Sequence, residues 1–227
     1  TALSIAGLLS DSKLKVESKK LQLGENDLST LSQKDWESTR GKNIGMVFQE
    51  PQSSLNPSMR CGIQVMERLQ KFEKGDKKTN FAKVLSAFNE VQLPNPERVF
   101  KAYPHELSGG QKQRVMIVMA LICKPQLLIA DEPTTALDVS VQKEILSLIK
   151  EQQKINKMSI LFISHDLSLV SQFADRVIVM HQGKLIETEK TAKIFRHPKF
   201  PYTRALIFAR PQPCLLYTSD AADDVEC

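Results

Sequence analysis

The sequence predicts an α/β fold built around a mainly parallel β-sheet. Four short apolar runs, rich in Ile and Val and too short for helices, indicate buried strands at residues 44–48, 127–130, 160–163 and 177–180. Amphipathic stretches separate these runs, and strands that alternate with helices pair in parallel. A chain of 227 residues is long enough for one sizeable domain of this class, with or without a small appendage.

Apolar side chains at helical spacing predict the helices between the strands. One stripe comprises Phe81, Val84, Leu85, Phe88 and Val91, and a second comprises Val141, Ile145, Leu148 and Ile149. A further helix covers residues 112–123 and ends before Lys124-Pro125. The dipeptide Gln182-Gly183 predicts a hairpin turn, so an antiparallel pair of strands follows the parallel ones.

The composition excludes several classes of protein. With 41% hydrophobic and 25% charged residues, the chain is globular and not disordered, collagen-like or stapled by disulfides. The four cysteines form no Cys-x-x-Cys pair, which argues against a zinc site. Cysteines without a disulfide framework fit a protein of the reducing cytosol. The longest apolar run, residues 115–123, is far shorter than the ~20 residues of a membrane span, so any membrane role is peripheral. The net charge of +5 suits either phosphate-bearing ligands or a solvated basic face.

The two ends of the sequence differ from the rest. The first residues lack the order of a signal peptide. Residues 214–227 begin with a stretch whose back-translation resembles the end of a transposon-based sequencing adapter, so we expect them to be read-through and exclude them from the fold. The alternative is a native acidic tail.

The first candidate binding element is Ser108-Gly109-Gly110-Gln111, directly before a predicted helix. Ser108 is a good N-cap, and the two glycines let the backbone approach an anion that the free amides and the helix dipole attract. Alone, this pattern describes a turn and cap equally well.

Polar side chains follow three of the predicted strands. Asp131 and Glu132 follow the strand at 127–130, His165 follows the strand at 160–163, and Gln49 follows the strand at 44–48. Because open α/β sheets bind ligands at the carboxyl ends of their strands, we expect these groups to meet at one edge. There Asp131 could hold a magnesium ion, Glu132 could act as a general base on water, and His165 could orient that water beside a phosphate.

These residues resemble the ATP-binding subunits of ATP-binding-cassette (ABC) transporters, over essentially all of residues 1–213. Residues 107–111 are similar to the family's signature motif, 127–132 to its Walker B strand and 136–138 to its D-loop. His165 resembles the switch histidine and Gln49 the Q-loop glutamine. The stretches 48–57, 103–106 and 197–206 resemble the importers of di- and oligopeptides, nickel or glutathione.

The resemblance implies a P-loop NTPase-like fold, the ABC ATPase fold, with a helical signature subdomain. It implies a partial catalytic core with the Q-loop at 1–58, the helical subdomain at 59–118, the rest of the core at 119–190 and the start of a peptide-importer segment at 191–213. No Gly-x-x-x-x-Gly-Lys-Ser/Thr motif occurs in the chain, so the Walker A loop is absent. We therefore expect an N-terminally truncated piece that starts just after that loop and is inactive by itself.

The resemblance also implies the chemistry and the partners. ATP and Mg²⁺ would be bound between two nucleotide-binding domains, which form a homodimer, a heterodimer or one fused chain. Ser108, Gly109, Gly110, Gln111 and Asp138 would contact nucleotide across that interface, with Glu132, His165 and Gln49 catalytic and Asp131 and Gln49 at the metal. Transmembrane permease subunits would hold the protein at the cytoplasmic face of the inner membrane, and a separate substrate-binding protein would deliver substrate.

The full-length protein is thus expected to be an ATPase that energises a di- or oligopeptide importer. One alternative is a soluble ABC-type ATPase that acts on nucleic acid or ribosomes, although the importer-like stretch at 197–206 makes a nucleic-acid partner the less favoured reading. The other alternative is a non-catalytic docking fragment.

Overall fold

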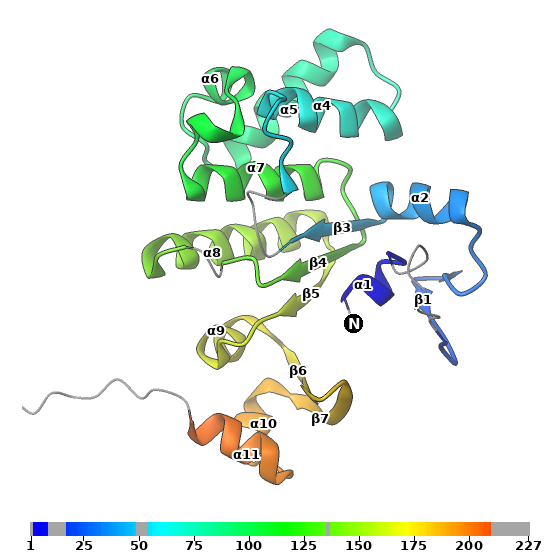
Figure 1. The fold of residues 1–227 in the computed structure, drawn as a ribbon, viewed down its shortest axis with the longest axis vertical. Helices are drawn as coiled ribbons and strands as arrows, with labels where there is room; N and C mark the ends of the chain where they lie inside the picture. Colours follow the sequence, from blue (N-terminus) through cyan, green and yellow to red (C-terminus); the bar gives the residue numbers. More distant parts are fainter. Residues whose placement is uncertain (1, 9–16, 49–53, 135–136, 210–227) are drawn as a thin grey trace, which may run out of the picture. The chain divides into compact units, whose positions relative to one another are not determined.

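The computed structural model describes residues 2–8, 17–48, 54–134 and 137–209 (Figure 1). The chain divides into two compact units, residues 1–165 and residues 166–227.

A three-stranded parallel sheet forms the centre of the first unit. Its strands, in the order β3-β4-β5, are β3 (Ile44–Val47), β4 (Leu127–Asp131) and β5 (Ser159–Ile163). Both edges of the central strand β4 are paired, and its residues Leu128, Ile129 and Ala130 are fully buried. The structure thus confirms the predicted α/β fold with a mainly parallel core.

Two predictions about buried strands need correction. The apolar side chains of β5 are half-buried, because within the described residues only β4 pairs with this strand. In the second unit Val177 and Val179 are buried, but Ile178 and Met180 are exposed. Successive side chains of a strand point to opposite faces, so the run at 177–180 covers a core with one face only.

Helices pack beside the sheet and on one another. Helix α7 (Gly109–Leu121) contacts β3 and carries eight buried side chains, so it lies inside the unit and not on its surface. On the side of α7 away from β3 lie α4 (Cys61–Phe72), α5 (Lys77–Glu90) and α6 (Pro96–Lys101) (Figure 1). The remaining elements of this unit are α1 (Ala2–Ile5), β1 (Gln22–Leu23), β2 (Asn26–Asp27), α2 (Gln33–Lys42), the 3₁₀ turn η1 (Pro104–Glu106) and α8 (Val139–Asn156).

The predicted helical stripes form the packing faces of α5 and α8. Val84 and Phe88 of α5 and Ile145 and Ile149 of α8 are each fully buried. Phe81 makes an edge-to-face contact with Phe100 of α6, with ring centroids 4.7 Å apart. Aromatic pairs of this geometry add to the stability that burial alone provides.

The second unit is built on an antiparallel hairpin. It comprises α9 (Leu167–Phe173), β6 (Arg176–His181), β7 (Lys184–Lys190), α10 (Thr191–Arg196) and α11 (Pro201–Phe208). The turn residues Gln182 and Gly183 both have positive φ angles, 47° and 75°, as a tight hairpin turn requires. The predicted hairpin is therefore confirmed. In the described part of the chain, no helix is both long enough and apolar enough to cross a bilayer.

Candidate functional site

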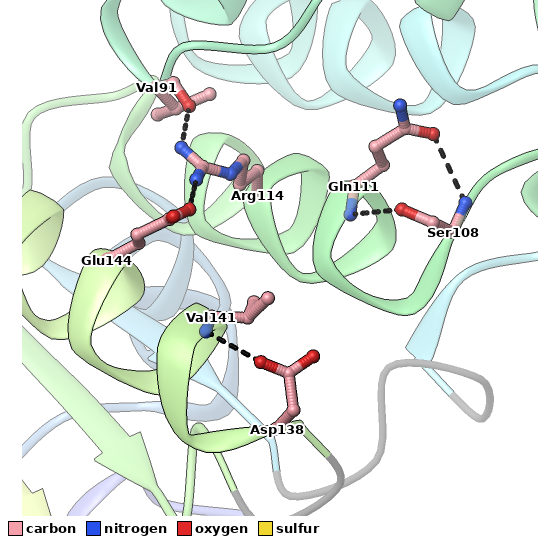
Figure 2. Close-up of polar contacts among 7 residues, drawn as sticks. All are labelled: Val91, Ser108, Gln111, Arg114, Asp138, Val141 and Glu144. Carbon is pink, nitrogen blue, oxygen red and sulfur yellow. Dashed lines mark hydrogen bonds and ion pairs between the residues drawn. The ribbon is translucent and has the colours of Figure 1, made fainter.

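The start of helix α7 is fixed by a reciprocal pair of hydrogen bonds. The Ser108 hydroxyl accepts a bond from the Gln111 amide at 3.3 Å, and the Gln111 side-chain oxygen accepts one from the Ser108 amide at 3.1 Å (Figure 2). This capping box confirms the predicted N-cap and places Gly109 and Gly110 in the first turn. The amides of a first helical turn have no carbonyl partner within the helix, so this end suits an anion.

The start of α7 lies against the start of α8. A Cβ added to Gly110 would be 3.1 Å from Val141 Cγ1, and one added to Gly109 would be 3.7 Å from Leu137 Cδ2. Asp138 is the N-cap of α8 and accepts a hydrogen bond from the Val141 amide at 2.9 Å (Figure 2). The Ser108-Gly109-Gly110 turn and Asp138 are therefore neighbours, although Asp138 here caps its own helix.

Glu132 and His165 meet beyond the ends of β4 and β5. The Glu132 Oε1 and His165 Nδ1 atoms are 3.0 Å apart. The pairing of Asp131 with Ile163 in the parallel ladder brings the two residues to this distance. The side chain of Glu132 is 22% exposed and that of His165 is 72% exposed, so solvent and ligands can reach the pair.

Glu132 has an unusual backbone conformation. Its φ angle is 46°, in the left-handed region that side-chain-bearing residues avoid. Its amide donates a hydrogen bond to the Ile163 carbonyl at 2.9 Å, which extends the β4–β5 ladder by one bond. Backbone strain of this kind collects at functional sites, and here it occurs at the residue that we predicted as general base.

Asp131 is the last residue of β4 and its side chain is partly exposed. The described residues contain no group of three or more His, Cys, Asp or Glu side chains that could enclose a metal ion. A single accessible carboxylate fits Mg²⁺, because this ion is commonly held by one or two carboxylates together with substrate phosphates and water.

Two predicted residues cannot be placed. Gln49 and Ala136 lie outside the described residues, so the roles expected for Gln49 at the metal and in catalysis stay predictions. The structure does bring Glu132 and His165 together at one edge of the sheet, and the start of α7 against the start of α8.

Two polar residues that carry no prediction are buried in α7. Gln113 is 1% exposed and its Nε2 donates a hydrogen bond to the Pro133 carbonyl. Arg114 is 9% exposed and its guanidinium donates to the Val91 carbonyl and to Glu144, each at 2.7 Å (Figure 2). The signal that could have found them is a pair of polar residues directly before the apolar run of the same helix.

Comparisons with known proteins identify the family. The ABC transporter family matches residues 3–135. The dipeptide transport ATP-binding protein DppD of Haemophilus influenzae is 46% identical over 212 residues, which are 93% of this chain and 64% of that protein. The oligopeptide transport ATP-binding protein OppD of Bacillus subtilis is 49% identical over 185 residues, 82% of this chain and 52% of that protein. The chain thus spans less than two thirds of the length of these relatives.

A solved structure agrees with this result. A dimeric ATP-binding cassette, MJ0796, in a post-hydrolysis state bound to ADP and Pi, has a TM-score of 0.67 and 26% sequence identity, covering 76% of this chain and 73% of its own. The fold is therefore that of an ABC ATPase. Matched over more than half of its length, the chain belongs to the ABC transporter family.

Proposed function

We propose that the full-length protein containing this chain binds and hydrolyses ATP to drive the import of peptides. The observation that carries the proposal is the 3.0 Å contact between Glu132 Oε1 and His165 Nδ1 at the carboxyl edge of a parallel sheet. A carboxylate beside an imidazole, both open to solvent, suits an attack by water on a phosphate.

In this proposal Glu132 takes a proton from the attacking water as the water oxygen bonds to the terminal phosphorus of ATP. The bond from that phosphorus to the bridging oxygen breaks, and ADP leaves with that oxygen. The Nδ1–H of His165 donates to the Glu132 carboxylate, which fixes the orientation of both side chains, and the Nε2 atom of the neutral ring accepts a hydrogen bond from that water. Asp131 would hold Mg²⁺, and the ion would supply positive charge to neutralise the phosphates. Gln49 would be a second protein ligand of this ion.

The capped start of α7 serves a second copy of the nucleotide-binding domain. The Gly109 and Gly110 amides and the Ser108 hydroxyl face the ATP bound by the partner, while Gln111 holds this turn in place through the capping box and Asp138 lies beside it. The dimeric state of the similar cassette with ADP and Pi supports this arrangement. Hydrolysis therefore needs two domains, as a homodimer, a heterodimer or a fused chain.

Peptides are the proposed cargo, because the similar proteins are named as dipeptide and oligopeptide transport proteins. Transmembrane permease subunits would bind the protein at the cytoplasmic face of the membrane, and a separate binding protein would deliver the peptide.

Glu132→Gln in the full-length protein tests the chemistry. The amide keeps the size of the side chain but cannot accept a proton, so we expect ATP binding to remain and turnover to fall by at least ~100-fold, the scale of general-base catalysis. Glu151→Gln, the same change at an exposed position on α8, is the matched control and should leave turnover unchanged. Normal hydrolysis by Glu132→Gln would remove the general-base role.

A second measurement tests the transport role. ATPase activity that rises when permease subunits and peptide-loaded binding protein are added in liposomes would support peptide import. Binding to DNA or RNA that weakens steeply with salt would instead favour a nucleic-acid ATPase.

A further inference from the structure

Gln113 is a buried amide with one well-defined partner. It lies on α7 four residues after Gly109, so it faces the same side of the helix as the first glycine of the turn. The side chain is 1% exposed, and its Nε2 donates a hydrogen bond of 2.5 Å to the Pro133 carbonyl. Because burial of a polar group is unfavourable without such a bond, the contact fixes the distance between α7 and the chain after β4.

The residue that precedes Pro133 is the strained Glu132. A side-chain-bearing residue keeps a φ of 46° only where its surroundings hold it there. On the N-terminal side, the Glu132 amide is bonded to the Ile163 carbonyl at 2.9 Å. On the C-terminal side, Gln113 holds the Pro133 carbonyl. The left-handed turn at Glu132 is therefore fixed from both directions, once by the sheet and once by α7.

The next residue is held by a second helix. The Thr134 carbonyl accepts a hydrogen bond from Gln142 Nε2 of α8 at 3.0 Å. Gln142 is only half-buried, and its partner lies two residues from Glu132, whereas the partner of Gln113 is adjacent to it. Of these two amides, Gln113 has the more direct hold on the conformation of Glu132.

We propose that Gln113 is a positioning residue for Glu132 and couples the first turn of α7 to that carboxylate. Through Gln113, the position of the turn Ser108-Gly109-Gly110 is linked to that of the Pro133 carbonyl. The Pro133 carbonyl in turn fixes where the Glu132 side chain lies relative to His165. This inference rests on the proposed function, because it assumes that Glu132 acts in ATP hydrolysis.

Gln113→Met in the full-length protein tests the proposal. Methionine has a similar length and no hydrogen-bond donor, so the Pro133 carbonyl loses its partner while the helix keeps its packing. Misplacement of a reacting group by about 1 Å can lower a rate ~100-fold, so we expect kcat to fall ~10- to 100-fold. ATP affinity and KM should stay within about twofold of the wild type, because Gln113 does not contact nucleotide.

Two variants separate positioning from structure. Gln152→Met is the matched control, since Gln152 is another buried glutamine, 5% exposed on α8, that hydrogen-bonds Asn156 and not the loop after β4. It should lower the melting temperature about as much as Gln113→Met and leave kcat unchanged. Gln113→His places an imidazole Nε2–H the same number of bonds from Cα as the amide, and should restore much of the lost rate.

A double variant tests whether Gln113 acts through Glu132. In a Glu132→Gln background, Gln113→Met should cause no further loss of the residual single-turnover rate, because residues that act as one unit are not additive. An equal loss in both backgrounds would overturn the proposal. Gln113→Met with kcat within about twofold of the wild type would also overturn it; if that variant does not fold, Gln113→Leu replaces it.

The results distinguish this inference from the proposed function. If Glu132→Gln abolishes turnover but the Gln113 variants are as active as Gln152→Met, only the positioning role fails. If Glu132→Gln hydrolyses ATP normally, the general-base role fails, and the positioning role fails with it.

Discussion

Replacement of Arg114 by methionine should destabilise the first unit by an amount that its contacts define. The guanidinium is 9% exposed and joins three helical segments: α7 itself, the Val91 carbonyl at the end of α5, and Glu144 of α8. Methionine keeps much of the apolar stem and removes both hydrogen bonds, each 2.7 Å long. The expected loss of stability therefore comes mainly from the two hydrogen bonds and not from packing.

The two lost bonds differ in weight. Val91 is 2% exposed, and a buried carbonyl left without a partner costs about 1–3 kcal/mol. The Glu144 side chain is 57% exposed and can return to water, so its ion pair contributes only ~0.5 kcal/mol. Removal of a buried charge also recovers some desolvation energy, which opposes these losses. We expect a net destabilisation of about 1–2 kcal/mol.

Thermal unfolding of the full-length protein, followed by circular dichroism, measures the effect. For a folding unit of roughly 150–250 residues, the range into which the first unit falls, about 1 kcal/mol shifts the melting temperature by roughly 2–4 °C, so the transition of this unit in Arg114→Met should lie ~3–6 °C lower. Glu144→Gln, which removes only the charge of the exposed partner, should shift it by less than ~2 °C. A melting temperature of Arg114→Met within ~1 °C of the wild type, or an equal loss in Glu144→Gln, would refute this reasoning.

Three further predictions concern the fold and the site. Burial raises the pKa of the Cys61 thiol from its usual 9.0 to about 11, so the stability linked to the neutral thiol is complete below pH 9 and is lost as the pH rises toward 11; Cys61→Ala should flatten this fall in urea titrations between pH 8 and pH 11. Gly45→Ala would place a Cβ 2.5 Å from the Ala120 carbonyl oxygen, and such overpacking should cost about 1–3 kcal/mol in urea unfolding. Ser108→Ala removes the acceptor for the Gln111 amide and should cost about 1 kcal/mol in the same assay, whereas an unchanged midpoint would show that the cap does not contribute.

Local patterns were enough to predict most of the fold. Short apolar runs located β3, β4 and β5, the apolar stripes located α5 and α8, and Gln182-Gly183 located the hairpin. Each of these features depends on residues close together in the sequence. The degree of burial of β5 and β6 does not, because it depends on which strands and helices cover each face, and there the prediction was wrong.

The site was predictable to a similar extent. The rule that parallel strands end at one edge predicted that Glu132 and His165 would be near each other, and the register of the ladder sets their actual distance. The roles of Gln113 and Arg114 could not be predicted, since their partners lie 20 and 30 residues away along the chain. The catalytic roles of Asp131, Glu132 and His165 stay predictions until the variants are measured.

At position 132, with its left-handed backbone, the residue that stability favours differs from the residue that the proposed activity needs. With a φ of 46°, this position would be less strained as glycine or asparagine. A library of all residues at position 132, selected only for resistance to heat or proteolysis, should therefore become enriched in those two residues. The same library selected for growth that requires the proposed peptide import should keep glutamate. The difference in unfolding free energy between the two selected variants then measures the stability cost of glutamate at this position.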